Sequence, residues 1–151
     1  MSLIEKVHEA KSYSEALRAI IAHFHADSGT IHMLESDGVL HLKAASDGLP
    51  EVVLAAVRLV PVGKGMAGLA FQRGEPVNKC NIQTATGGDV QPGARATGME
   101  GALVVPVFRG DKPVGALGIA NRTERTFSDE ETALLIDAGR AVAATAKAAT
   151  L

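Results

Sequence analysis

The sequence is poor in cysteine and aromatic residues and contains no tryptophan. Cys80 is the single cysteine, so the chain can form no intrachain disulfide and supply no cysteine-based zinc site. The net charge is -2, and the sequence has neither a Lys/Arg cluster nor a tryptophan. A nucleic-acid-binding surface normally needs both positive charge and stacking side chains. These absences predict a protein of a reducing compartment with no nucleic-acid partner.

Long apolar runs are also missing. No stretch approaches the roughly 20 apolar residues of a membrane span. The N-terminal segment MSLIEKVHEAK lacks the cationic stretch and apolar run of a secretion signal. We therefore expect a cytoplasmic protein without membrane contact. What is present, 151 residues with 46% hydrophobic and 21% charged side chains, is typical of one soluble globular domain with its own core.

Apolar spacing predicts helices at both ends of the chain. Helical spacing runs through the first 25 residues, and the S-x-x-E pattern at Ser12 to Glu15 predicts a helix start near Tyr13. The same capping-box pattern at Ser128 to Glu131 predicts the start of the last helix. Two shorter helices are expected near residues 50–57 and 65–73.

Between the helices the period changes to that of strands. Two β-favouring runs flank Asp37-Gly38, which predicts a hairpin with a two-residue turn. This turn would place Leu34 opposite His41 and His32 opposite Lys43. The faces would then separate Ile31, Met33, Leu40 and Leu42 from the polar residues. A second hairpin is expected around residues 110–112, so the pattern as a whole predicts an α+β fold with an antiparallel sheet.

The glycines of PVGKGMAGLAF match G-x-G-x-x-G at Gly63, Gly65 and Gly68. A dinucleotide site needs this pattern inside a parallel βαβ unit, with an acidic residue about 20 positions later. Asp89 lies at about that distance, but it sits in TGGDVQPG rather than at a strand end, and the flanking hairpins are antiparallel. We interpret the glycines as structural residues that permit a tight turn and close helix packing.

Four segments together carry a family resemblance, and they are DSGTIHMLESDGVLHLKAASDG, VPVGKGMAGLAFQRGEPVN, GALVVPVFRGDKPVGALGIANR and TFSDEETALLIDAGRAVAATA. In this order they resemble a GAF domain, a small-molecule sensor fold. The resemblance implies five or six antiparallel strands, with the terminal helices on one face and the short helices plus a long loop on the other. Residues 14–147 would form the GAF domain, preceded by an N-terminal helical extension at residues 1–13.

The long stretch from residue 80 to residue 101 is rich in glycine and threonine and has no regular period. A loop of this length in a compact domain is usually functional, so we expect it to cover a ligand pocket on the sheet. Arg95 would anchor an anionic group, with a solvated arginine as the alternative. Cys80 is expected at the rim of this pocket, and the alternative is that it is a small side chain packed in the interior. The predicted ligand-binding residues are Cys80, Asn81, Asp89, Arg95, Thr97, Met99 and Glu100.

No Ser/His/Asp or paired-carboxylate arrangement can be argued from the spacing, so we predict no catalytic residue. His32 and His41 lie on neighbouring strands, but we interpret them as ordinary surface or core residues rather than metal ligands. The residues indicate no particular cofactor. The pattern therefore favours a non-catalytic sensor or regulatory module that binds a small molecule and acts in signal transduction through a separate output protein.

Two alternatives stay open. The first is an enzyme similar to the free methionine-(R)-sulfoxide reductases, disfavoured because disulfide-forming thiol chemistry needs a second cysteine. The second is a dimerisation module with a vestigial pocket. We also expect a homodimer through the terminal helices, because apolar or small residues recur there at helical spacing. They are Leu3, Ile4 and Val7 in the first helix and Ala138, Ala141, Val142 and Thr145 in the last.

Overall fold

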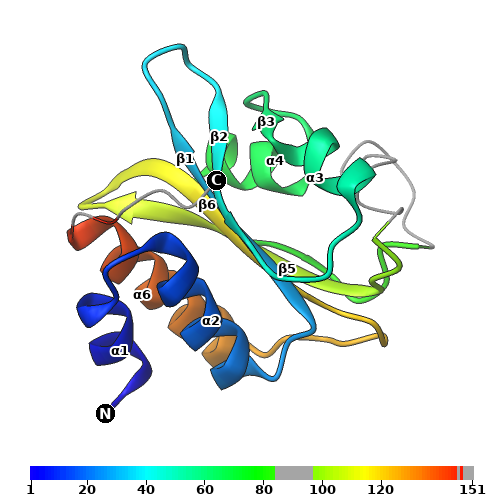
Figure 1. Cartoon of the computed structure of the whole chain (residues 1–151), viewed down its shortest axis with the longest axis horizontal. Helices are drawn as coiled ribbons and strands as arrows, with labels where there is room; N and C mark the ends of the chain where they lie inside the picture. Colours follow the sequence, from blue (N-terminus) through cyan, green and yellow to red (C-terminus); the bar gives the residue numbers. More distant parts are fainter. Residues whose placement is uncertain (84–96, 146, 148–151) are drawn as a thin grey trace.

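The computed structural model describes residues 1–83, 97–145 and 147, and its centre is a six-stranded antiparallel sheet (Figure 1). The strand order is β3-β2-β1-β6-β5-β4. All paired strands run antiparallel, as the sequence predicts. The strands are β1 (Ser28–Leu34), β2 (Leu40–Ala45), β3 (Leu59–Val60), β4 (Val77–Lys79), β5 (Gly101–Arg109) and β6 (Lys112–Asn121).

Helices cover both faces of the sheet (Figure 1). One face carries α1 (Leu3–Glu9), α2 (Tyr13–Phe24) and α6 (Asp129–Ala144). The other face carries the short helices α3 (Glu51–Val57) and α4 (Gly65–Arg73). The predicted α+β architecture, with the terminal helices on one face and the short helices on the other, is confirmed.

Side-chain caps fix the helix starts where the sequence predicts them. The Ser12 hydroxyl accepts a hydrogen bond from the Glu15 amide at 3.1 Å, at the start of α2. At α6 the Ser128 hydroxyl accepts from the Glu131 amide at 3.1 Å, and the Glu131 carboxylate accepts from the Ser128 amide at 3.0 Å. This reciprocal capping box satisfies two backbone donors that a helix start otherwise leaves unpaired.

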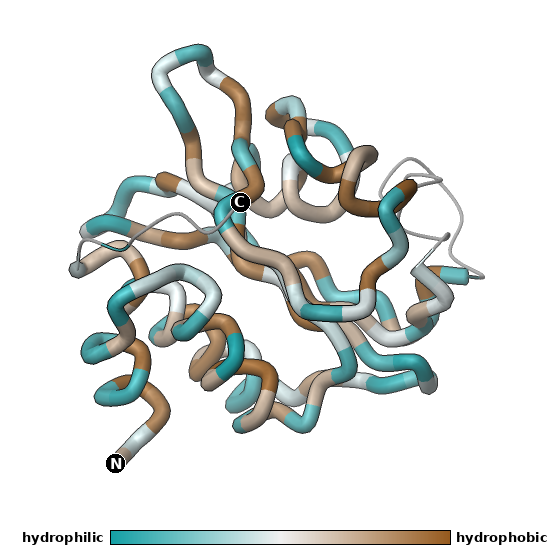
Figure 2. Tube along the Cα trace, in the orientation of Figure 1, coloured by the Kyte–Doolittle hydropathy of each residue, from teal (hydrophilic) through white to brown (hydrophobic). Residues whose placement is uncertain are grey.

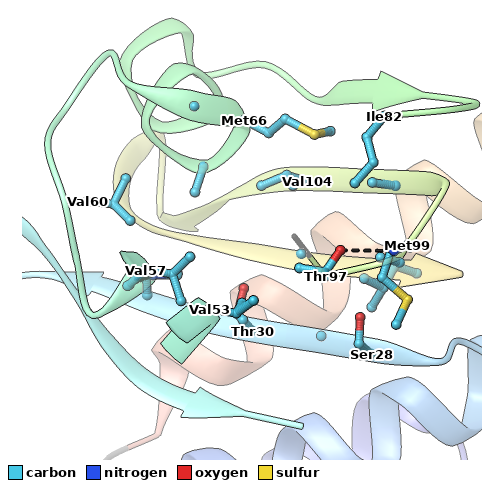
Figure 3. A pocket seen from close by; sticks show the side chains of 18 of the residues that line it. Ser28, Thr30, Val53, Val57, Val60, Met66, Ile82, Thr97, Met99 and Val104 are labelled. Atoms are coloured by element: carbon cyan, nitrogen blue, oxygen red, sulfur yellow. Dashed lines mark hydrogen bonds between the residues drawn. The ribbon is translucent and has the colours of Figure 1, made fainter. Parts of the chain in front are cut away.

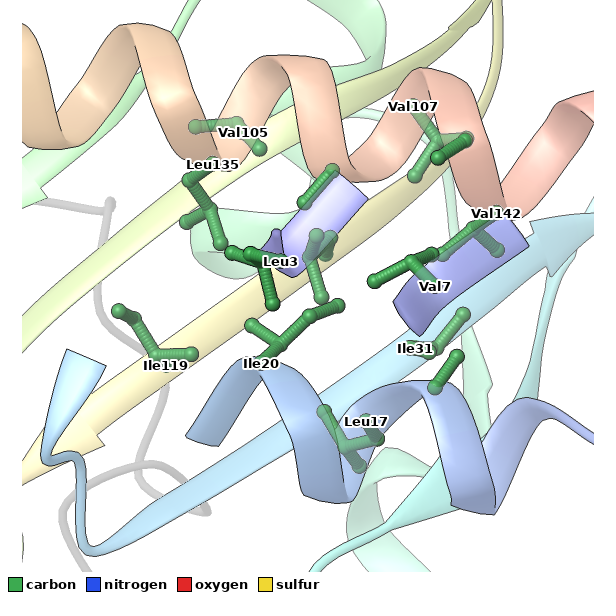
Figure 4. Close-up of a cluster of buried hydrophobic side chains, with 14 of the residues drawn as sticks. Leu3, Val7, Leu17, Ile20, Ile31, Val105, Val107, Ile119, Leu135 and Val142 are labelled. Carbon is green, nitrogen blue, oxygen red and sulfur yellow. The ribbon is translucent and has the colours of Figure 1, made fainter. Parts of the chain in front are cut away.

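The main core lies between the sheet and the three terminal helices (Figure 4). It follows from strand alternation, because Leu103, Val105 and Val107 occupy every second position of β5 and face the helices. Leu117 and Ile119 of β6 do the same. The hydropathy colouring in Figure 2 alternates along α1 and α2 between hydrophilic and hydrophobic residues, as expected for helices with one face on a core.

The residues expected to form the dimer are used inside the chain. Ala138, Ala141 and Val142 are fully or almost fully buried, in the same cluster as Leu3 and Val7. The helix that approaches the small residues of α6 is therefore the chain's own α1, which contacts both α2 and α6. The spacing was interpreted correctly as a close helix contact, but the partner is internal. The homodimer stays a prediction that these buried residues do not support.

The first hairpin differs from the predicted register. Leu34 pairs with Leu40 and His32 with Leu42, because the turn has three residues with Gly38 third, at φ +78°. Asp37-Gly38 fits this turn as well as the two-residue one, since a left-handed glycine is needed in both. Leu40 and Leu42 consequently share a face with His32 instead of joining Ile31 on the helix-covered face. A bulge between Ile31 and His32 then shifts the register again, so that Ile31 pairs with Ala44.

The G-x-G-x-x-G glycines have a structural role in this arrangement. A Cβ atom on Gly68 would lie 2.5 Å from the Pro61 carbonyl oxygen and 3.1 Å from the Gly63 nitrogen. Gly63 itself has φ +87°, a conformation that L side chains rarely adopt. The strand before α4 is the two-residue β3, which pairs antiparallel with β2, so the parallel unit of a dinucleotide site is not formed here.

Candidate ligand cavity

A cavity of about 350 Å³ lies between the sheet and the layer of α3 and α4 (Figure 3). The strand positions facing it include several small side chains together with Val104 of β5. Ala102 of β5 and Gly118 and Ala120 of β6 line its floor, whereas the alternate positions of both strands carry large aliphatic residues. A Cβ atom on Gly118 would lie 3.1 Å from Val104 Cγ2, so a larger residue there would crowd the Val104 side chain.

The walls of the cavity are mainly apolar. Val53 and Val57 come from α3, Met66 comes from α4, and Ile82 and Met99 come from the two chain segments that flank residues 84–96. Figure 3 shows these side chains arranged around the space above the sheet. The cavity is therefore lined mainly by apolar side chains with a few polar atoms, which is the usual composition of a small-molecule site.

Polar side chains enter the cavity along one strand. Ser28, Thr30 and His32 occupy alternate positions of β1 and all three line the cavity. Ser28 is only 6% exposed. Neither the Ser28 nor the Thr30 hydroxyl makes a hydrogen bond to another described residue. We call these three residues the β1 polar row.

His32 links β1, at the floor of the cavity, to α3, which covers it. Its Nε2 atom donates a hydrogen bond to the Val57 carbonyl oxygen, the last residue of α3, at 2.8 Å. The ring is 2% exposed, and burial lowers the pKa of His32 below the usual 6.5, against the smaller opposing effect of the Val57 hydrogen bond. The other ring nitrogen, Nδ1, is buried without a hydrogen-bond partner among the described residues. His32 is therefore a neutral Nε2–H tautomer at pH 7.

The structure brings two of the predicted ligand-binding residues to the cavity. Thr97 and Met99 both line it, and the Thr97 hydroxyl accepts a hydrogen bond from the Met99 amide at 3.0 Å. This bond turns the chain into β5 and presents the Met99 side chain, 4% exposed, as an apolar wall. Asp89 and Arg95 lie outside the described residues.

The other three predicted residues lie beside the cavity but are not among its described lining residues. Cys80 is exposed and its thiol is free. The Asn81 side-chain amide donates to the Glu124 carboxylate at 2.7 Å. Glu100 uses its backbone to continue the sheet, with its amide donating to the Asn121 carbonyl oxygen at 2.7 Å. These contacts hold the ends of the 80–101 stretch in place at the end of the sheet.

The predicted ligand-binding residues included neither the β1 polar row nor the α3 wall. The alternation of polar residues in SGTIHM was visible, and so were the small residues of GALGIA at positions 115–120. Taken together they indicate one sheet face with polar groups beside empty volume. The missing information was that β1 and β6 are neighbours, which follows from pairing between distant segments.

The described residues give no sign of a metal site or a membrane span. Within residues 1–83 and 97–145, no three His, Cys, Asp or Glu side chains are grouped so that they could hold a metal ion. In the same part of the chain no helix combines the length and the apolar character needed to cross a bilayer.

A family model described as GAF domain matches residues 10–145. The chain belongs to the GAF domain family. GAF domains are generally regulatory modules that bind small molecules. A search of curated proteins finds no match.

Solved structures share the fold. A GAF domain from an Acinetobacter phosphoenolpyruvate-protein phosphotransferase has a TM-score of 0.77 and 21% identity, covering 94% of this chain and 86% of that one. The free methionine-R-sulfoxide reductase from Neisseria meningitidis, solved with its substrate, has a TM-score of 0.74 and 15% identity over 93% and 81%. The type II free methionine-R-sulfoxide reductase from Thermoplasma acidophilum has a TM-score of 0.69 and 21% identity over 95% and 94%. The TM-scores show that these proteins share the fold of this chain.

Proposed function

We propose that this GAF domain is a non-catalytic sensor that binds a small molecule in the cavity between the sheet and the α3 and α4 layer. The observation that carries the proposal is the cavity itself, about 350 Å³ with mainly apolar walls and the β1 polar row on its floor. That volume is at the lower end of the range of known ligand pockets. Ligand binding would regulate a separate output protein in the cytoplasm.

The enzyme alternative has less support from the cavity. Reduction of a sulfoxide by thiols needs a cysteine at the bound substrate, yet Cys80 is exposed and is not among the described lining residues. His32 donates its Nε2–H to the Val57 carbonyl oxygen, and its pKa is lowered, so it is not available as a proton donor to a substrate at pH 7. These features favour binding over turnover.

The decisive experiment compares ligand retention by the full chain and by a variant whose cavity is filled. Ala120→Leu adds a large side chain to the cavity floor, while Ala133→Leu makes the same change on the exposed side of α6. Native mass spectrometry should find a retained small molecule on the wild type and on Ala133→Leu, but not on Ala120→Leu. No retained molecule and no fragment binding in any of the three proteins would contradict the proposal and favour a dimerisation module with a vestigial pocket.

We also propose a homodimer for the assembled sensor, tested by sedimentation of the full chain at micromolar concentration. Deletion of residues 1–11 would not test the dimer, because it removes Leu3 and Val7 from the core. A monomer at all concentrations would contradict the proposed dimer without affecting the ligand site.

A further inference from the structure

We infer that the cavity binds an uncharged, mainly apolar molecule whose carboxamide-like group is held by the hydroxyls of Ser28 and Thr30. The inference rests on the proposed ligand-binding function and specifies the chemistry of the ligand. Three observations carry it: the unpaired hydroxyls, the lack of buried charge in the lining, and the size of the cavity.

The two hydroxyls are placed to receive one polar group. Ser28 and Thr30 are two residues apart on β1, so their Cα atoms are separated by about 6.6 Å at the usual rise of a strand. Figure 3 shows both side chains projecting from β1 toward the side of the cavity where Thr97 and Met99 lie. Ser28 is more than nine-tenths buried, and neither hydroxyl bonds to another described residue. Because both residues line the cavity, one ligand group can form hydrogen bonds to both hydroxyls.

A carboxamide fits this spacing. Its carbonyl oxygen accepts one hydrogen bond and its NH₂ group donates another, while each hydroxyl can donate or accept. Two bonds of about 2.8 Å on either side of such a group span a little more than the separation of the two strand positions. A single ligand group can therefore satisfy both side chains.

The lining disfavours a charged ligand group at this position. Among the described lining residues only His32 and Lys64 have ionisable side chains, and no carboxylate is present. His32 is neutral at pH 7, and Lys64 is exposed, so its charge lies at the solvent side of the cavity. Transfer of an unpaired carboxylate into such a site is strongly unfavourable. An anion held by Arg95, which lies outside the described residues, is the competing outcome.

The volume sets the size of the apolar part. A cavity of about 150 Å³ holds one benzene molecule, and this cavity has about 350 Å³. One or two fused rings with a small polar substituent fill it. Suitable probes are benzamide, cyclohexanecarboxamide and 2-naphthamide, each compared with the carboxylate and the hydrocarbon of the same ring.

The test measures dissociation constants of these nine probes for the full chain at pH 7, by ligand-observed NMR and calorimetry. At least one amide should bind about tenfold more tightly than its matched carboxylate. Ser28→Ala and Thr30→Val should each weaken amide binding about two- to tenfold, the range of one neutral hydrogen bond, and leave hydrocarbon binding unchanged. Ser36→Ala, on the exposed turn of the hairpin, is the matched control. Circular dichroism checks that each variant is folded, and Thr30→Val keeps a β-branched side chain on the strand.

Each contrary result has a distinct meaning. Carboxylates that bind as tightly as the amides, with binding lost in Arg95→Ala, would overturn the inference and identify an anion site. Hydrocarbons that bind as well as amides, with no effect of Ser28→Ala or Thr30→Val, would overturn it while leaving the proposed small-molecule site intact. Absence of binding by all nine probes would overturn the inference, and it would contradict the proposed function as well if native mass spectrometry also finds no retained molecule.

Discussion

Replacement of Gly68 by alanine tests the close approach of α4 to the segment before it. The new Cβ atom would lie 2.5 Å from the Pro61 carbonyl oxygen and 3.1 Å from the Gly63 nitrogen, both backbone atoms that cannot rotate away. Overpacking of this kind costs about 3 kcal/mol at its upper end. Alanine regains about 1 kcal/mol through its higher helix propensity. We therefore expect Gly68→Ala to lower the free energy of unfolding by about 2 kcal/mol.

Gly139 in α6 provides the matched control. It is also a buried helical glycine, but the nearest atom to its added Cβ would be Val107 Cγ2 at 3.5 Å, an ordinary contact. Gly139→Ala should therefore gain the full helix propensity and raise the free energy of unfolding by about 1 kcal/mol. Urea denaturation followed by circular dichroism measures both variants, which should differ by about 3 kcal/mol with similar m-values.

The sign of the difference decides the argument. If Gly68→Ala stabilised the protein as much as Gly139→Ala, the tight packing of α4 on Pro61 would be refuted. The glycine pattern at Gly63, Gly65 and Gly68 would then need an explanation other than close packing. A loss of about 2 kcal/mol would support the structural interpretation.

Three further predictions follow from the cavity and the helix caps. Burial lowers the pKa of His32, so between about pH 6.5 and that lowered pKa the unfolded chain binds this proton while the folded chain does not. The free energy of unfolding should therefore fall as the pH falls through this range. In urea titrations His32→Gln should reduce this pH dependence, whereas His23→Gln, at an exposed position, should keep it. Ser128→Ala removes the α6 capping box and should cost about 1 kcal/mol, with an equal loss in Ser36→Ala contradicting the cap. Purified protein should not reduce free methionine-(R)-sulfoxide with dithiothreitol or thioredoxin, and turnover that disappears in Cys80→Ser would sink the non-catalytic proposal.

The order of elements and the capped helix starts could be predicted because their signals are local, whereas the placement of the helices on the two faces of the sheet came from the family resemblance. Ser128 and Glu131, for example, form a cap within four residues, whatever the rest of the chain does. Thr97 and Met99 were found as cavity residues because they lie where the long stretch enters β5.

The remainder depends on contacts between distant segments. The register of the first hairpin turns on whether Gly38 is the second or third turn residue, and both fit the same sequence. The role of His32 depends on the Val57 carbonyl oxygen, 25 residues away, and no local pattern reveals that bond. The burial of Ala138 against α1 similarly requires knowing which helix comes closest.

The alternation along β1 also means that one short segment encodes two properties that can change separately. Ile31 and Met33 contribute to the core that keeps the domain folded, while Ser28 and Thr30 face the cavity. Substitutions at the cavity-facing positions would alter what the proposed site binds while leaving the core side chains untouched. A library varied only at Ser28, Thr30 and the neighbouring Ala120 should therefore contain mostly folded members with different binding preferences. This domain would then be a suitable scaffold for selecting new small-molecule sensors.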